Sequence, residues 1–316
     1  MPAMNDELPG HGHTVLIIAA HADDAALFCG GTLRLMADRG ARVVMLRVTD
    51  DRYDSVGMSV AETIAANTAQ MHRAAKILGI DEIIELGWET DRLGDASEVA
   101  LRERFIYHVR RVKPYAVMSF DPYGAFHEDN QDHIKVAHAV DETYWTAQFD
   151  KHHPEHFAEG LAPHGVFERW YFARRIVEVT TPIDISSTLD RKVEAALAHE
   201  TMLRHYVNQL RLQARTGGHD IELLQRALDG DLRALMEPLL RGGARATGRR
   251  HGLAAAEEFR VVRFGGLEQF FGIETTGNEF RNGADPGTAQ AITFADGGGT
   301  GNLRDKRFYP PGEGGR

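Results

Sequence analysis

The chain has 316 residues, of which 43% are hydrophobic and 26% charged, and its net charge is −10. This composition is typical of a globular protein with a sizeable core, and the acidic excess gives no electrostatic basis for binding nucleic acid. No apolar run approaches the ~20 residues that cross a bilayer, and residues 1–13 lack the pattern of a signal peptide. The single cysteine, Cys29, excludes an intrachain disulfide. We therefore expect a cytoplasmic protein with neither nucleic acid nor membrane as partner.

Strands and helices alternate over the first 120 residues. Short apolar runs rich in β-branched residues predict strands at 15–20, 41–48, 83–87 and 115–120. Helical spacing of apolar residues predicts helices at 25–38, 60–78 and 99–112, which Gly40, Gly79 and Pro114 close. This alternation predicts an α/β fold, a Rossmann-like, doubly wound and mostly parallel sheet.

The second half of the chain has a less regular pattern. Strand-like runs occur at 170–173, 176–179, 181–185 and 259–262, and helical spacing occurs at 189–214 and 222–240, the latter ending at Gly242-Gly243. Glycine becomes frequent from Gly265 onward. We expect a flexible N-terminus at 1–13, one domain at 14–264 with a helical insertion at 219–250, and a loosely structured, Gly-rich tail at 265–316.

The first group of candidate functional residues directly follows the first predicted strand. His21, Asp23 and Asp24 stand where this strand ends and a helix begins. Ligands of open α/β sheets bind at this edge, and charged groups next to a buried strand are costly unless they are paired or functional. An imidazole and a carboxylate three residues apart can reach one metal ion. The alternative is a helix-capping aspartate beside an interior histidine.

The second group lies after the fourth predicted strand. In a sheet ordered three-two-one-four, the first and fourth strands are neighbours, and the loops that follow them face each other. This order would bring His133 to His21 and Asp24, a two-histidine, one-carboxylate set that suits catalytic zinc. A solvated loop leading into a helix is an equally good interpretation for His127, Glu128, Asp129 and His138.

Two stretches resemble the motifs of a known family. Ala20-His21-Ala22-Asp23-Asp24 with Gly30-Gly31-Thr32 resembles the AHPDD…GGT signature of the PIG-L/LmbE-like zinc-dependent N-deacetylases. Asp121-Pro122-Tyr123-Gly124 followed by Asp132-His133 resembles the second motif of that family, which usually ends in HPDH. The family includes N-acetylglucosaminyl-phosphatidylinositol, mycothiol, bacillithiol and diacetylchitobiose deacetylases. The resemblance extends from residue 14 to about residue 200.

The resemblance implies a role for each matching residue. His21, Asp24 and His133 would bind one zinc ion per subunit, or another divalent metal. Asp23 would be the general base for the attacking water, and Asp132 would orient a neighbouring histidine or support His133. The implied reaction removes an N-acetyl or other N-acyl group from an amino sugar or a glycoconjugate.

The sequence also departs from these motifs. The first histidine of HPDH falls on Asn130, whose amide can donate a hydrogen bond but cannot supply a proton. The resemblance implies that this histidine assists the oxyanion or the leaving group. Either His127 or His138 does so here, or the chemistry differs. Two alternatives therefore stay open: a metal-dependent hydratase of an unsaturated dicarboxylic acid on the same fold, and a non-catalytic family member.

Residues that would recognise a substrate are less specific. Tyr123 and Trp88, in loops near the predicted site, could stack on a sugar ring, and Arg52 and Arg92 could hold an anionic group. Ordinary packing explains each aromatic residue equally well, and a solvated surface residue is the better interpretation of either arginine taken alone. We expect a small N-acylated, sugar-like molecule as the partner and leave a homo-oligomer open.

Overall fold

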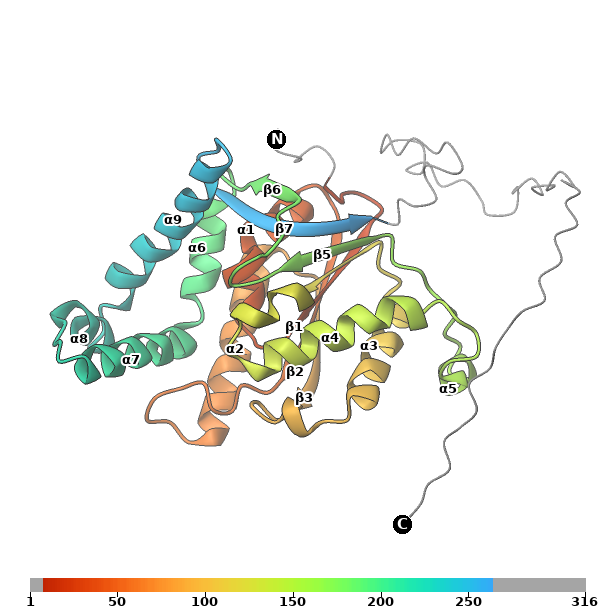
Figure 1. The fold of residues 1–316 in the computed structure, drawn as a ribbon, viewed down its shortest axis with the longest axis horizontal. Coiled ribbons are helices and arrows are strands. Elements are labelled where there is room, and N and C mark those ends of the chain that lie inside the picture. Colours follow the sequence, from red (N-terminus) through yellow and green to blue (C-terminus); the bar gives the residue numbers. More distant parts are fainter. Residues whose placement is uncertain (1–7, 264–316) are drawn as a thin grey trace, which may run out of the picture. The chain divides into compact units, whose positions relative to one another are not determined.

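A seven-stranded sheet forms the centre of the computed structural model, which describes residues 8–263 (Figure 1). Its strand order is β3-β2-β1-β4-β5-β7-β6. The strands from β3 to β5 in this order are parallel, and β7 runs antiparallel to β5 and β6. The strands are β1 Thr14–Ala19, β2 Arg42–Thr49, β3 Glu82–Trp88, β4 Ala116–Phe120, β5 Glu168–Phe172, β6 Thr181–Asp184 and β7 Ala256–Arg263.

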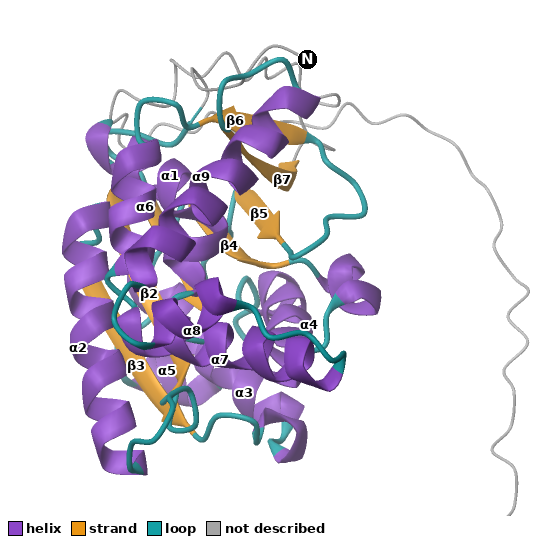
Figure 2. Cartoon of the chain, turned by 90° about the vertical axis from the view of Figure 1, so that its left-hand side faces the viewer, coloured by secondary structure: helices purple, strands orange, loops and turns teal. Residues whose placement is uncertain are grey.

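Helices cover both faces of this sheet (Figure 2). On one face lie α1 (Asp24–Asp38), α2 (Val60–Leu78) and α6 (Leu189–Leu197). The other face carries α3 (Glu98–Val112) and α4 (Gln131–Thr146). Residues 15–20 are buried throughout, as expected of a parallel strand covered on both sides. The predicted fold class and the order of the first four strands are confirmed.

Local sequence signals set the ends of the crossover helices. Ser59 and Glu62 form a capping box at the start of α2, and Gly79 ends this helix in the left-handed region with φ of 79°. The crossovers bring β1 and β4 side by side, with Val15 opposite Ala116. The chain therefore leaves both strands at the same edge of the sheet.

The C-terminal half adds helices outside this layered core. These are α7 (Glu200–Thr216), α8 (Glu222–Leu228) and α9 (Leu232–Arg250), and a smaller apolar cluster that includes Leu203, Leu224 and Leu235 holds them together. α8 and α9 fall within the predicted helical insertion. The remaining elements are α5 (Pro154–Ala158) and two short 3-10 helices, η2 (Leu93–Asp95) and η3 (Pro122–His127).

Three details of the predicted elements are wrong. The helix expected at 189–214 is broken at His199 (φ −85°, ψ 50°), which lets α6 pack on α1 while α7 packs on α8. The helix expected to end at Gly242-Gly243 continues to Arg250, because packing of α9 on α6 and β7 outweighs the ~1 kcal/mol cost of each helical glycine. The run 176–179 is not a strand, since β6 takes the place beside β7.

The structure describes part of the expected N-terminal segment but not the expected C-terminal tail. Leu8 is buried in the core, and the His13 ring stacks on Tyr115 with centroids 3.9 Å apart, so residues 8–13 of the expected flexible N-terminus pack against the domain. Residues 1–7 and the tail expected at 265–316 lie outside the described residues. Within residues 8–263, no helix has the length and apolar character needed to span a membrane.

Candidate metal centre

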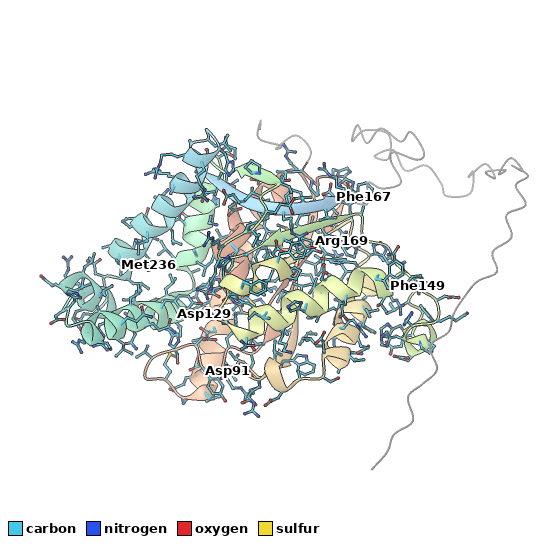
Figure 3. All side chains as sticks on the ribbon, in the orientation of Figure 1. Asp91, Asp129, Phe149, Phe167, Arg169 and Met236 are labelled. Atoms are coloured by element: carbon cyan, nitrogen blue, oxygen red, sulfur yellow. The ribbon has the colours of Figure 1, made fainter. Side chains whose placement is uncertain are left out.

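The central residues of the candidate site lie at or next to the first turns of two helices, α1 and α4. Asp24 is the first residue of α1, and its Oδ2 accepts a hydrogen bond of 2.8 Å from the backbone N–H of His21. His133 lies in the first turn of α4, which begins beside Asp129 (Figure 3). The two helices follow the neighbouring strands β1 and β4, so their first turns face each other across the sheet edge.

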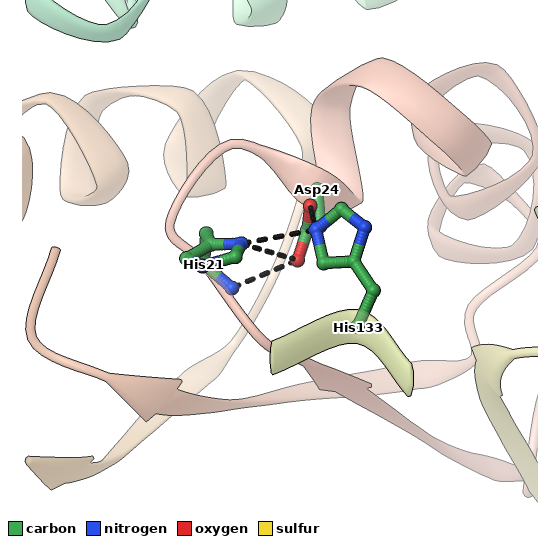
Figure 4. A group of neighbouring side chains, drawn as sticks. All are labelled: His21, Asp24 and His133. Atoms are coloured by element: carbon green, nitrogen blue, oxygen red, sulfur yellow. Dashed lines mark hydrogen bonds and ion pairs between the residues drawn. The ribbon is translucent and has the colours of Figure 1, made fainter. Parts of the chain in front are cut away.

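Three side chains from these turns converge on one point (Figure 4). His21 Nδ1 lies 3.0 Å from His133 Nε2, and Asp24 Oδ1 lies 3.3 Å from the same His133 nitrogen. Asp24 Oδ2 is 3.8 Å from His21 Nδ1. Ligands about 2.0–2.2 Å from a tetrahedral ion lie about 3.3–3.6 Å apart, so these spacings fit one metal ion. All three residues are buried.

Carboxylates hold the outer nitrogen of each ring. His133 Nδ1 lies 2.9 Å from Glu128, and His21 Nε2 lies 3.3 Å from Asp132. Since an ionised carboxylate only accepts, each outer nitrogen carries a proton, and in the neutral rings the two inner nitrogens face each other with lone pairs. A proton or a metal ion between them removes this repulsion. The donor set and its supporting carboxylates therefore fit a bound cation.

The surroundings carry an excess of negative charge. Burial disfavours a charged His21, but the hydrogen bond that this ring donates to Asp132 and the charges of Asp24, Asp51 and Asp54 outweigh it and raise the pKa of His21 to about 10. Without a metal, this ring therefore carries a second proton, on its inner nitrogen, at neutral pH. A metal ion would displace that proton and would balance the same carboxylates.

Asp23 precedes Asp24 in the chain, and its two carboxylate oxygens have different surroundings. Its side chain is fully buried, and Oδ2 accepts a hydrogen bond of 2.9 Å from the Tyr206 hydroxyl. Oδ1 has no hydrogen-bond partner among residues 8–263. Burial and then the charge of Asp24 raise the pKa of Asp23 to about 7. A carboxylate with a free oxygen and such a pKa is suited to take up a proton near neutral pH.

The second motif is organised differently from its expected form. Asn130 caps α4: its side-chain oxygen accepts from the backbone N–H groups of Asp132 and His133. Asp132 supports His21, and it also accepts a bond of 2.7 Å from the Asp91 N–H. Glu128, not Asp132, supports His133. For Glu128 the sequence left a solvated loop and a functional role open, and its place five residues before His133 gave no signal that decides between them.

The contacts of the other candidate residues are with residues other than the three converging side chains. His127 and His138 are exposed, so neither faces the buried centre in place of the missing histidine. Arg52 pairs with Asp50 and Glu89, and Arg92 pairs with Asp95. Tyr123 is 58% exposed with Arg260 stacked 4.3 Å from its ring centre, and Trp88 packs at the end of β3.

Further residues around the centre were not singled out from the sequence. Asp51 is buried, and its Oδ2 accepts from the Ala22 N–H at 3.2 Å and from Arg47 at 3.0 Å. Asp121, in the second motif, accepts two hydrogen bonds from Arg260 on β7. Both carboxylates anchor the loops that carry the converging side chains. The polar end of β2 was the available signal for Asp51.

A second group of possible ligands lies elsewhere, at His153, Glu155 and His156 in and before α5. His156 Nδ1 lies 3.1 Å from the Arg110 guanidinium and Nε2 lies 2.7 Å from Glu103. The guanidinium only donates and the carboxylate only accepts, so neither ring nitrogen keeps a free lone pair. This group is therefore a structural hydrogen-bond network.

Comparison with known proteins supports the resemblance seen in the motifs. Residues 16–144 match the family model described as PIG-L, GlcNAc-PI de-N-acetylase. The diacetylchitobiose deacetylase of Thermococcus kodakarensis is 27% identical over 198 residues, which cover 62% of this chain and 72% of that protein. The 4-oxalmesaconate hydratase of Pseudomonas putida is 28% identical over 213 residues, which cover 63% of this chain and 79% of that protein.

A solved structure shows the same fold. The N,N'-diacetylchitobiose deacetylase from Pyrococcus horikoshii superposes with a TM-score of 0.64 at 21% identity, covering 79% of this chain and 84% of that one. The family match spans both motifs and includes His21, Asp24 and His133. The part of the chain that holds both motifs is therefore similar to the PIG-L family.

Proposed function

We propose that this chain is a metal-dependent amidohydrolase that removes an N-acetyl or other N-acyl group from an amino sugar or glycoconjugate. One observation carries the proposal: His21, Asp24 and His133 converge within the range of a single metal ion, next to Asp23 with its free, buried oxygen. The deacetylases among the relatives act on sugars of this kind by their names. The substrate is a small molecule.

His21, Asp24 and His133 would hold the metal, for which we propose zinc. Two histidines and one carboxylate are a common ligand set of catalytic zinc sites. When bound there, the ion supplies Lewis acidity, which lowers the pKa of a water and polarises the amide carbonyl. The carboxylates of Glu128 and Asp132 keep the two imidazoles in the orientation that presents their inner nitrogens.

Asp23 would move the proton. Its Oδ1 takes a proton from the attacking water while oxygen adds to the amide carbonyl carbon. The same proton can then pass to the leaving nitrogen as the carbon–nitrogen bond breaks, which yields a free amine and a carboxylic acid that ionises by losing its proton to the solvent or the amine. These reaction steps need no histidine in the place of Asn130, because Asp23 both takes and returns the proton.

A hydratase is the second candidate function. Two observations keep this alternative open: the 28% identical relative is named 4-oxalmesaconate hydratase, and position 130 is an asparagine. The same base and cation could direct water to a carbon–carbon double bond instead of an amide. A non-catalytic role is disfavoured by the four buried ionisable side chains of the centre, which are costly to keep without chemistry.

The proposal is tested by following amine release. The metal-loaded protein is offered a panel of N-acetylated amino sugars, and primary amine is measured with a fluorogenic reagent. We expect chelator-sensitive release that falls by about 10²–10⁴-fold in Asp23→Asn, because an amide cannot act as base. Asp129→Asn, an exposed residue, is the matched control and should match the wild type.

The outcomes separate the candidates. Release of amine by the Asp23→Asn variant at the wild-type rate would remove Asp23 as the base. Hydration of unsaturated dicarboxylates without any amine release would favour the hydratase.

A further inference from the structure

Tyr206 reaches the candidate metal centre from outside the part of the chain that matches the family. It lies on α7, more than sixty residues beyond the end of the matched range 16–144. Its ring packs against the apolar core, and its hydroxyl lies 2.9 Å from Asp23 Oδ2. This tyrosine is therefore joined to the residue that we propose as the base.

The hydrogen bond has a fixed direction. Burial, followed by the charges of Asp23 and Asp24, raises the pKa of Tyr206 far above its usual value, so the phenol keeps its proton. The hydroxyl donates and Asp23 accepts. Because Oδ2 is occupied in this way, Oδ1 is the oxygen left to accept another proton. A single bond thus decides which oxygen of Asp23 is available.

α7 is itself held against the loop and helix that follow β2. Gln70 on α2 donates to the Thr201 hydroxyl at 2.6 Å and accepts from the Thr201 N–H at 3.0 Å. One residue before Tyr206, His205 Nδ1 lies 3.2 Å from the Ser55 carbonyl oxygen. These contacts fix the position of the helix turn that carries Tyr206, so its hydroxyl is presented to Asp23 from a rigid element.

We propose that Tyr206 is a positioning residue for the hydrolysis: its hydroxyl clamps Asp23 Oδ2 so that Oδ1 faces the attacking water. This inference rests on the proposed function. A carboxylate free to rotate would present either oxygen in many orientations, and proton transfer depends on a defined hydrogen-bond geometry. The clamp removes that freedom without contact between Tyr206 and the substrate.

Tyr206→Phe tests this role because it removes the hydroxyl and keeps the ring that packs on the core. We expect kcat to fall at least about tenfold while KM and the bound metal stay at wild-type values. Tyr107→Phe is the control, since it removes a tyrosine–carboxylate bond of the same 2.9 Å length, to Glu159. Its kcat should remain unchanged. An unchanged kcat in Tyr206→Phe would overturn the proposal.

A double variant separates positioning of Asp23 from any other effect. In the Asp23→Asn background there is no base to position, so adding Tyr206→Phe should lower the residual activity by less than twofold. A full second loss in the double variant would show that Tyr206 acts independently of Asp23, which overturns the proposal. Wild-type protein that releases no amine would instead overturn the proposed function, and the role of Tyr206 with it.

Discussion

Each histidine of the candidate metal centre is held by its own carboxylate, His133 by Glu128 and His21 by Asp132. Glu128 holds His133, and Arg174 in turn lies 3.0 Å from Glu128. Burial disfavours an ionised Glu128, but its hydrogen bonds with His133 and Asn130 and the charge of Arg174 lower the pKa of Glu128 to about 2. Glu128 is therefore ionised at neutral pH and fixes the proton of His133 on the outer nitrogen.

Removal of this support should weaken metal binding. We expect Glu128→Ala to lower the metal affinity by about 10–100-fold, because the His133 ring loses its orientation and some of its basicity. Competition with a chromophoric chelator measures this affinity. Asp129→Ala changes the neighbouring exposed carboxylate and should leave the affinity unchanged. Equal affinities in both variants and the wild type would exclude the role of Glu128.

His199 makes a separate prediction about pH. This residue is buried, and neither ring nitrogen has a hydrogen-bond partner among the described residues. Burial lowers the pKa of His199 to about 3, whereas an unfolded histidine titrates near ~6.5. Between these values the unfolded chain binds one more proton at this site than the folded chain, so the stability falls as the pH falls below about 6.5.

A variant isolates this contribution from those of other groups. Relative to His199→Gln, the wild type should lose about 1.4 kcal/mol of unfolding free energy per pH unit below about pH 6.5. Urea denaturation of both proteins at about pH 7 and about pH 5 measures the difference. Parallel pH dependences for the two proteins would contradict the assignment.

At the scale of elements, Asn130 is the N-cap of α4 at the position where the expected second motif has a histidine. Asn130 caps this helix and so fixes the first turn that carries His133. We expect Asn130→Ala to lower the unfolding free energy by about 1 kcal/mol and Asn130→Ser to restore most of it, since serine is also a good N-cap. Urea denaturation gives both values. A serine variant as unstable as the alanine variant would contradict the capping role.

Elements also explain which contacts could not be predicted from the sequence. The approach of Tyr206 to Asp23 depends on the break at His199, which turns α7 away from the line of α6. Helical spacing continues across this point, so one long helix was predicted, and nothing in the pattern indicated that Tyr206 points inward. Glu128 was missed because a short polar loop gives no periodicity that tells a buried carboxylate from a solvated one.

At the scale of the whole molecule, the order of strands was the most predictable feature and also the most useful. Alternating strands and helices indicated a doubly wound sheet, and its reversal between β1 and β4 brought His21, Asp24 and His133 to one edge. The structure places these side chains together. Their role as metal ligands stays a prediction, as do the roles of Asp23 and Asp132.

Substrate recognition depends on features that the strand order does not determine. Tyr123, Trp88, Arg52 and Arg92 stay predictions as substrate-binding residues. Asn67 on α2 donates to the Asp51 and Asp54 carbonyl oxygens. Gln70, three residues on, binds Thr201 on α7. These two amides brace the loop after β2 and α7, so both have structural contacts.

The most direct test of the account is the metal content of the purified protein. After loading with zinc and removal of the excess, elemental analysis should find one ion per chain in the wild type and none in His133→Ala. His138→Ala, which changes an exposed histidine of the same helix, should retain the ion. A wild type that binds no metal, or a His133→Ala variant with full occupancy, would contradict the assignment of the centre.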